Sequence, residues 1–237
     1  MILTAHQPAY IPWAGLIHKI YLSDVFVFFD DVQYVPKDFM NRNFIFLDGK
    51  AQWLTVPVIT KGHREKRIHE ITINYQLNWK RKHLKTIEIA YKKLPFFNKY
   101  FGPLSEILAR EWTYLSDLNF TILKFIMDEL NIKRKILRAK DYDFKGVKSD
   151  LIVDMCKKLG FKQYIFGERG IDYVDLKLFK ENNINLYFQN FIPPKYAFEN
   201  LKVKENLSIL DMLFRFGPLK TMELILKENI NYNEKYF

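Results

Sequence analysis

The sequence predicts an α/β fold, with a Rossmann-like parallel sheet core and an inserted β-hairpin plus helical region. A strand–helix–strand pattern fills the first 30 residues, which is the spacing of a right-handed βαβ unit. The same alternation returns after about residue 145, and a hairpin followed by helical patterns lies between. We therefore expect a single domain over 1–237, with its core at about 1–35 and 145–237 and the insertion at about 36–144.

Short apolar runs define the N-terminal elements. Residues 1–5 are typical of a short buried strand, and a helix can open at Pro12 or Trp13, because proline is tolerated in a first helical turn. Residues 25–29 read Val-Phe-Val-Phe-Phe. An unbroken apolar run of this length indicates a strand that is covered on both faces.

The middle of the chain has a different pattern. The stretch NFIFLDGKAQWLTVPVI, residues 43–59, places two β-rich runs around Asp48-Gly49, which is a hairpin signal. Helical patterns follow at 78–91 and 106–131. This region therefore predicts a β-hairpin followed by helices.

Strands and helices alternate again in the last third of the chain. Residues 149–160 predict a helix that Ser149 caps and Gly160 ends. The runs QYIFG (163–167) and INLYFQNF (184–191) predict strands, and SILDMLFRFG predicts a helix that stops at Gly217.

Composition and charge limit the possible classes of protein. A single cysteine, Cys156, excludes a disulfide within the chain, and no apolar run is long enough for a membrane span. With no signal peptide recognised, we expect a cytoplasmic protein that does not insert into a membrane. The net charge is +10, and residues 61–93 carry ten Lys or Arg against three acidic residues. Such a segment attracts phosphates, although a solvated basic face explains it equally well.

Polar segments follow three of the predicted strands. They are HQPAYIPW (6–13), DDVQY (30–34) and GERG (167–170). Ligands of open α/β sheets bind beyond the carboxyl ends of strands, so we expect these segments to converge on one site. Pro8 and Pro12 stiffen the first segment, and a rigid loop holds binding groups in place.

The candidate catalytic residues are His6 and Asp30. The ring of His6 is the only group in its loop that titrates near neutral pH, and Asp30 can orient or replace it. Asp30 and Asp31 are adjacent, so strand alternation points them in opposite directions and weakens a paired-carboxylate mechanism. His6 can instead simply bond a carbonyl of its own loop.

Candidate substrate-binding residues surround these segments. They are Gln7, Tyr10, Trp13, Lys19, Gln33, Arg42, Asn43 and Gly167. Arg42 and Lys19 suit phosphate, the amides suit a sugar, and the two aromatic rings can either stack on a ligand or belong to the core. No metal-ligand spacing, P-loop or G-x-G-x-x-G motif occurs, so the sequence indicates no metal and leaves the cofactor unknown.

Several motifs, taken in order, resemble the WbqC-like family of bacterial proteins. They are HQPAYIPWAGLIHKI, SDVFVFFDDVQYVPKDFMNRN, WLTVPV, YIFGERGIDYV and LSILDMLFRFG, and they span nearly the whole chain. The family is associated with O-antigen and other surface-polysaccharide gene clusters, so the resemblance implies a role in lipopolysaccharide biosynthesis. Where the family often has Ser-Gly, this chain has Phe166-Gly167, which weakens any hydroxyl role there.

Three functional hypotheses follow. The first is a tailoring transferase that moves an acyl or aminoacyl group to the amine of a nucleotide-linked amino sugar, with the acyl donor carried by tRNA, by CoA or through ATP activation. The second is a protein that binds RNA such as a charged tRNA, because the basic segment carries interspersed aromatic residues. The third is a non-catalytic scaffold of a polysaccharide-synthesis complex. The sequence does not indicate an oligomeric state.

Overall fold

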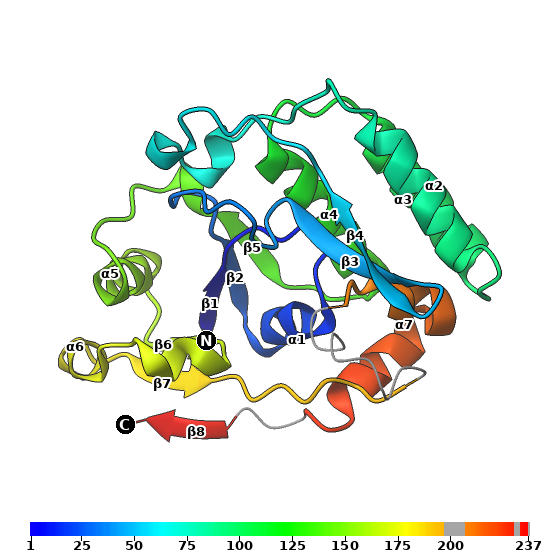
Figure 1. Ribbon diagram of the computed structural model, residues 1–237. Helices are drawn as coiled ribbons and strands as arrows, with labels where there is room; N and C mark the ends of the chain where they lie inside the picture. Colours follow the sequence, from blue (N-terminus) through cyan, green and yellow to red (C-terminus); the bar gives the residue numbers. More distant parts are fainter. Residues whose placement is uncertain (197–206, 230–232, 237) are drawn as a thin grey trace.

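A six-stranded sheet forms the centre of the computed structural model, which describes residues 1–196, 207–229 and 233–236 (Figure 1). Its strand order is β5-β2-β1-β6-β7-β8. The strands are β1 (Leu3–His6), β2 (Val25–Phe28), β5 (Lys135–Arg138), β6 (Gln163–Phe166), β7 (Asn185–Phe188) and β8 (Asn233–Tyr236). The first five are parallel, and β8 pairs antiparallel with β7. The predicted α/β class with a parallel sheet is confirmed.

The chain reverses its direction across the sheet beside β1. From β1 the strands proceed outward through β2 to β5, and the chain then returns to place β6 on the other side of β1. The buried hydroxyl of Thr4 donates to the carbonyl of Ile165 at 2.7 Å and joins the two halves. The boundary between β1 and β6 is therefore the topological switch point of the sheet. Ligands of open α/β sheets bind at such a point.

Both faces of the sheet are covered, as the apolar run of β2 predicts. Phe26 and Phe28 belong to one hydrophobic cluster, and Val25 and Val27 belong to a second. The first cluster contains side chains of α1 (Ala14–Leu22), α3 (Phe97–Ala109), α4 (Leu115–Glu129) and α7 (Leu210–Leu226), and the second contains those of α5 (Ser149–Leu159) and α6 (Leu176–Glu181). Alternate residues of one strand therefore serve two cores.

The predicted hairpin is present between β2 and the helices of the middle region. It consists of β3 (Arg42–Leu47) and β4 (Lys50–Thr55), which pair antiparallel around Asp48-Gly49. The short helices η1 (His63–Glu65) and η2 (Ile68–Glu70) follow, and then α2 (Trp79–Tyr91), α3 and α4. Further single turns are η3 (Ala139–Asp141) and η4 (Glu168–Asp172).

Strand β5 lies within the range that the sequence analysis gives to the insertion, yet it pairs with β2 in the central sheet. The central sheet therefore includes one strand from the range predicted as the insertion. The division into core and insertion stays a prediction in its other details.

The helix predicted to stop at Gly217 continues beyond it. Gly217 has φ 68° and ψ −179°, which breaks the helix, but Pro218 follows and a second helical stretch runs to Leu226. Proline fits the first turn of a helix, so the chain restarts rather than leaves the helical path. The result is a kinked α7.

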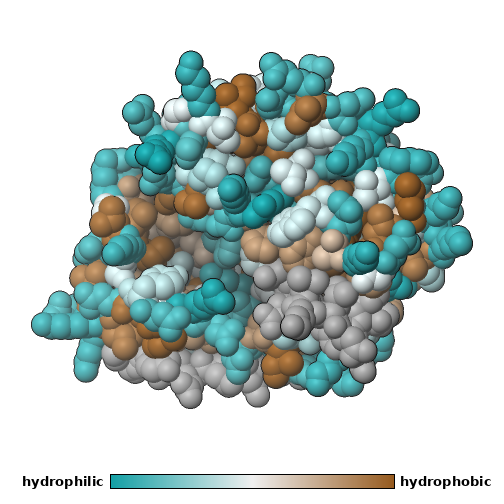
Figure 2. Space-filling view, in the orientation of Figure 1, coloured by the Kyte–Doolittle hydropathy of each residue, from teal (hydrophilic) through white to brown (hydrophobic). Residues whose placement is uncertain are grey.

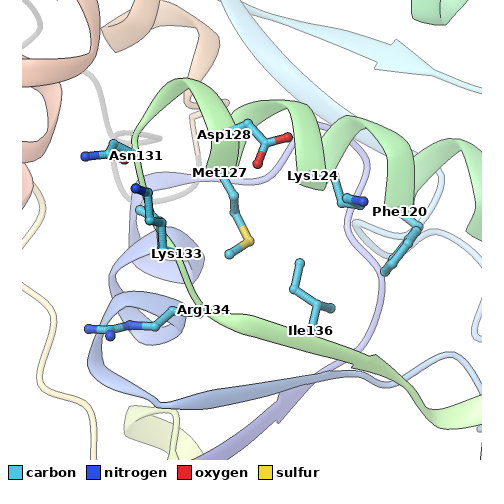
Figure 3. A pocket seen from close by; sticks show the side chains of 9 residues that line it. Phe120, Lys124, Met127, Asp128, Asn131, Lys133, Arg134 and Ile136 are labelled. Carbon is cyan, nitrogen blue, oxygen red and sulfur yellow. The ribbon is translucent and has the colours of Figure 1, made fainter.

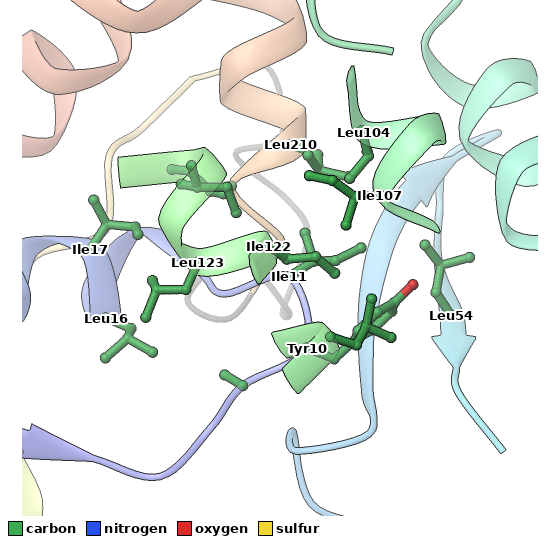
Figure 4. Close-up of a cluster of buried hydrophobic side chains, with 14 of the residues drawn as sticks. Tyr10, Ile11, Leu16, Ile17, Leu54, Leu104, Ile107, Ile122, Leu123 and Leu210 are labelled. Carbon is green, nitrogen blue, oxygen red and sulfur yellow. The ribbon is translucent and has the colours of Figure 1, made fainter. Parts of the chain in front are cut away.

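The loop after β1 is anchored in the larger core. Tyr10 and Ile11 are fully buried, and Figure 4 shows them beside Leu54 and Ile122. Because apolar packing fixes the middle of this loop, the residues at its two ends are held rigidly near the carboxyl end of β1. None of the described helices is both long enough and apolar enough to cross a membrane.

Candidate functional site

Two adjoining cavities open at the carboxyl ends of β1 and β6. One has a volume of about 470 Å³ and the other of about 500 Å³, and both are lined by His6, Lys19, Gly167 and Arg169. These volumes lie within the range of small-molecule sites. We call the first the central cavity, which Gln7, Lys148, Ser149 and Tyr173 also line, and the second the aromatic cavity, which Trp13, Phe39 and Phe191 also line.

The cavities lie where the topology predicts a ligand site. His6 is the last residue of β1, and Gly167 follows β6 directly. These two strands flank the switch point of the sheet. Figure 2 shows the surface of this face, which is hollowed next to the region of α5 with apolar side chains at the bottom of the hollow.

His6 presents a neutral imidazole to both cavities. Its Nδ1 lies 2.7 Å from the carbonyl oxygen of Gln7, which can only accept, so Nδ1 carries the hydrogen and Nε2 keeps a lone pair. Burial and the neighbouring Lys19 lower the pKa of His6 to about 4. The ring of Trp13 meets the imidazole edge-on, with centroids 5.5 Å apart. His6 can therefore accept a proton through Nε2 at neutral pH.

Lys19 places a buried amine between the two cavities. It projects from α1, is 6% exposed, and its Nζ donates to the carbonyl of Ala5 at 2.9 Å. Burial lowers the pKa of Lys19 to about 7. Near neutral pH the amine is thus divided between its charged and neutral forms, and an anion in the cavity would favour the charged one.

The central cavity is positively charged. It is lined by Lys19, Lys148 and Arg169, whereas none of the described residues that line it carries a carboxylate. Lys148 and Arg169 form no ion pair with any residue that the structure describes. The N-terminal turn of α5 also borders the cavity through Ser149 and Leu151, and a helix N-terminus favours negative charge. The arrangement suits a phosphate-bearing ligand.

The GERG segment positions Arg169. After β6 the chain passes through Gly167 into η4, and Gly170 packs against Phe166 so closely that an added Cβ would lie 2.4 Å from the Phe166 Cβ. A side chain at position 170 would push η4 away from the strand. The glycine therefore keeps Arg169 at the mouth of both cavities.

Aromatic rings form one wall of the second cavity. Trp13 and Phe39 contact each other with centroids 5.4 Å apart, and Phe191 lies across Gly15. Gln189 is buried there and donates to the carbonyl of Gly15 at 2.8 Å. Flat apolar walls of this kind accept a nucleobase or the face of a sugar.

Five predicted site residues are brought together. They are His6, Gln7, Trp13, Lys19 and Gly167, each of which lines at least one of the two cavities. Their roles toward a ligand stay predictions.

The structure directs Tyr10 and Asp30 away from both cavities. Tyr10 is fully buried, and its hydroxyl bonds Nδ1 of His83 at 2.8 Å. Asp30 is also fully buried, with one oxygen bound to Arg138 at 2.6 Å and the other accepting from the backbone nitrogen of Lys140. Direct catalysis by Asp30 and ligand stacking by Tyr10 therefore find no support in this geometry, because both side chains already have partners in the protein interior.

The remaining predicted residues hold the surrounding loops. The amide of Asn43 donates to the carbonyl of Ile11 at 2.7 Å, which ties the hairpin to the His6 loop. Arg42 lies over the ring of Trp53 at 4.6 Å and donates to the carbonyl of Lys37. Gln33 donates to the carbonyl of Arg64 outside both cavities. Gln33 comes after β2, whereas Arg42 and Asn43 open β3, and the direction of their side chains could not be predicted from the sequence.

Other cavity residues were not identified from the sequence. Arg169, Lys148, Phe39 and Phe191 line the cavities. Only Arg169 had a signal, as part of the GERG segment after a predicted strand. The others reach the site through tertiary packing of distant segments.

A separate cavity of about 350 Å³ lies between α4 and β5, as Figure 3 shows. Lys133 and Arg134 line it and precede β5, so it lies at the amino end of that strand. Arg134 donates to the carbonyl of Tyr21 at 2.9 Å and stacks on its ring. This cavity shares no residue with the two at the switch point.

Among the described residues, no group of three or more His, Cys, Asp or Glu side chains could hold a metal ion. Cys156 is buried in α5, and burial raises the pKa of its thiol to about 12. The thiol is therefore protonated and unreactive at neutral pH.

Comparison with known proteins identifies relatives without assigning a reaction. A sequence model of the WbqC-like protein family matches residues 7–223. The chain is 30% identical over 217 residues to an uncharacterized protein, Rv1507c, of Mycobacterium tuberculosis (strain ATCC 25618 / H37Rv), covering 89% of this chain and 92% of that protein. No solved structure matches significantly.

Proposed function

The chain belongs to the WbqC-like protein family, and we propose that it is a tailoring enzyme of bacterial surface-polysaccharide (O-antigen) biosynthesis. In this proposal it transfers an acyl or aminoacyl group to the amine of a nucleotide-activated amino sugar. The observation that carries the proposal is the central cavity at the switch point, where Lys19, Lys148 and Arg169 meet without a carboxylate among the described lining residues.

The two cavities suit the parts of a nucleotide-linked sugar. Lys19 and Arg169 line both cavities, so a diphosphate held between them would reach into each. The base would then stack on Trp13 and Phe39 in the aromatic cavity. The sugar would lie in the central cavity, where Gln7 offers an amide for its hydroxyl groups.

His6 supplies the proton acceptor that this reaction needs. When the sugar amine attacks the acyl carbonyl carbon, the nitrogen becomes positively charged and must lose a proton. Nε2 of His6 has a free lone pair because Nδ1 is held by Gln7. Its low pKa, about 4, makes the protonated ring a good acid that passes the proton on to the leaving group. Asp30 has no part in this scheme, since its oxygens are bound by Arg138 and Lys140.

Calorimetry of the full chain against dTDP-, UDP- and GDP-linked amino sugars tests the proposal. We expect one of them to bind, and Arg169→Ala to weaken that binding by roughly tenfold or more, because a charge-assisted hydrogen bond is lost. Arg81→Ala is the matched control, since Arg81 is exposed on α2 and lines none of the cavities described above. Absence of binding for all of these nucleotide sugars would reject the proposal.

RNA binding is the second candidate, and the exposed cations of α2 favour it. Arg81, Lys82 and Lys85 are exposed on this helix, and Lys92 and Lys93 follow it. Figure 1 shows α2 on the opposite side of the molecule from α5, which borders the central cavity. An RNA bound along α2 would therefore not need to enter the cavities.

A further inference from the structure

A third cavity adjoins the central cavity. It has a volume of about 480 Å³ and lies between the η1–η2 segment and the turn that leads into α5. Val32, Lys148 and Leu151 line both this cavity and the central one. We call the three adjoining cavities together the trough, in which His6 and Lys19 line the central and aromatic cavities. We call the third one the basic cavity, after Arg64, Lys66, Arg67 and Lys148, which line it.

The basic cavity has an excess of positive charge. Of its four cations, Arg67 pairs with Asp31. Arg64, Lys66 and Lys148 form no ion pair with a residue in the described ranges, and Glu65 is the other carboxylate among the described lining residues. The described lining residues thus carry four cations and two carboxylates, a net charge of +2, which attracts a ligand with several negative charges.

The boundary that the basic cavity shares with the central cavity is mostly apolar. Val32 and Leu151 form the shared boundary, with Lys148 as its only charge. A ligand that fills the trough would therefore have phosphates at one end, an extended uncharged linker, and its reacting group beside His6. An acyl phosphate or acyl adenylate lacks such a linker, because its phosphate is bonded to the reacting carbonyl.

We propose that the basic cavity binds the phosphate end of the acyl donor, and that this donor is a thioester of a phosphorylated carrier of the coenzyme A type. The inference rests on the proposed function, since it supplies the second substrate of the same transfer. The basic cavity is separate from the exposed cations of α2, which lie across the molecule (Figure 1). A compact polyphosphate group would contact the basic cavity and not the cations of α2.

The transfer is balanced without a further reactant. The lone pair of the sugar amine forms a bond to the thioester carbonyl carbon, and the carbon–sulfur bond breaks with its electron pair leaving on sulfur. The proton of the new nitrogen cation moves to Nε2 of His6 and then to the thiolate. The products are an amide and a free thiol.

Direct titration with coenzyme A tests the inference. Calorimetry measures coenzyme A binding to the full chain, alone and with saturating nucleotide-linked amino sugar. We expect the double variant Arg64→Glu with Lys66→Glu to weaken coenzyme A binding by about tenfold or more, because attraction becomes repulsion. Nucleotide-sugar affinity is expected to stay within about twofold, since these residues do not line the central or aromatic cavity. The matched control is Arg81→Glu with Lys82→Glu on α2, which should leave both affinities unchanged.

A second pair of substitutions, by uncharged residues, distinguishes a loss of binding from a loss of folding. If thermal unfolding shows that charge reversal destabilises the chain, Arg64→Gln with Lys66→Gln replaces it, and a loss of about threefold or more in coenzyme A affinity is then the expected result. The inference is overturned if coenzyme A does not bind under either condition, or if the α2 pair weakens its binding as much as the cavity pair. Nucleotide-sugar binding is measured separately, so the proposed function can survive that result.

Discussion

At the scale of single residues, burial makes His6 and Lys19 unusual bases. Both groups carry positive charge when protonated, and both line the central cavity, where none of the described lining residues carries a carboxylate; Glu168 lines the adjoining aromatic cavity. Burial lowers the pKa of both, and Lys19 lowers that of His6 further. A phosphate that enters the cavity would reverse this effect for Lys19. If the proposed phosphate-bearing substrate binds there, we therefore expect its binding to take up a proton near pH 7.

The pKa of His6 predicts a pH dependence of stability. Its pKa is about 4 in the folded chain and 6.5 when unfolded, so between these values the unfolded chain binds more protons. The free energy of unfolding should therefore fall as the pH decreases from 6.5 to 4. His6→Asn should flatten part of this decrease, as urea unfolding at several pH values would show. His63→Asn is the control, because that ring lies on the surface turn η1. An identical slope in the wild type and in His6→Asn would contradict the prediction.

The buried carboxylate of Asp30 has a structural prediction of its own. It holds Arg138, which also pairs with Asp117, and so links β2 to β5 and α4. Asp30→Asn removes the charge opposite the buried part of Arg138, and we expect it to lower the free energy of unfolding by about 3 kcal/mol. Urea unfolding measures this, with the exposed Asp172→Asn as the control. Nucleotide-sugar affinity should stay within about twofold, and a selective loss of turnover without destabilisation would return Asp30 to the catalytic machinery.

At the scale of elements, apolar pattern and turn chemistry determine most of the fold. The buried strand β2, the hairpin around Asp48-Gly49 and the helix that ends at Gly160 all follow from local sequence. The kink of α7 does not, because Gly217 signals a stop whereas Pro218 allows a new helical turn. Nor does the sheet membership of β5, since its partner β2 is more than 100 residues away in the chain.

The kink of α7 gives an element-scale prediction. Gly217 has a positive φ with an extended ψ, a region that is essentially restricted to glycine, and an added Cβ would lie 2.6 Å from Cε1 of Phe96. Gly217→Ala should therefore lower the free energy of unfolding by about 2 kcal/mol or more. Gly102→Ala in α3 is the matched control. That position has open space around it, and alanine is the better helix former, so a small gain in stability is expected there. Equal effects of the two substitutions on urea unfolding would contradict the strain at Gly217.

At the scale of the whole molecule, the sequence predicted some of the residues that line the two cavities but not all of them. Strand-exit reasoning found His6, Gln7 and Gly167, because the ends of parallel strands converge wherever the sheet forms. It misdirected Tyr10 and Asp30, since the direction of a loop side chain depends on the core that receives it. Lys148 and Phe191 reach the cavities by packing of segments that are distant in sequence. Residues at the carboxyl ends of the strands can thus be predicted from local sequence. The residues that complete the cavity walls depend on the tertiary fold.

The division of positive charge between the trough and α2 predicts how ligands respond to salt. RNA bound along α2 would contact several phosphates, so its affinity should fall steeply, with a slope of about −0.7 to −0.9 per phosphate contact in a plot of log affinity against log salt. A nucleotide sugar held by Lys19 and Arg169 is partly enclosed and should show a much weaker dependence. Measuring the affinity for each ligand at salt concentrations from about 50 to about 300 mM separates binding along α2 from binding in the cavities.

The same titration assigns each mode to its surface. Arg81→Glu with Lys82→Glu should reduce RNA affinity and its salt slope while leaving the nucleotide sugar unaffected, because α2 does not line the central or aromatic cavity. Arg169→Ala should instead reduce the affinity for the nucleotide sugar and leave the affinity for RNA and its salt slope unchanged. If nucleotide-sugar affinity instead fell as steeply with salt as RNA affinity, the ligand would be lying on the open surface rather than in the cavities. The charge of the chain would then serve general polyanion binding, and His6 would have no substrate to act on.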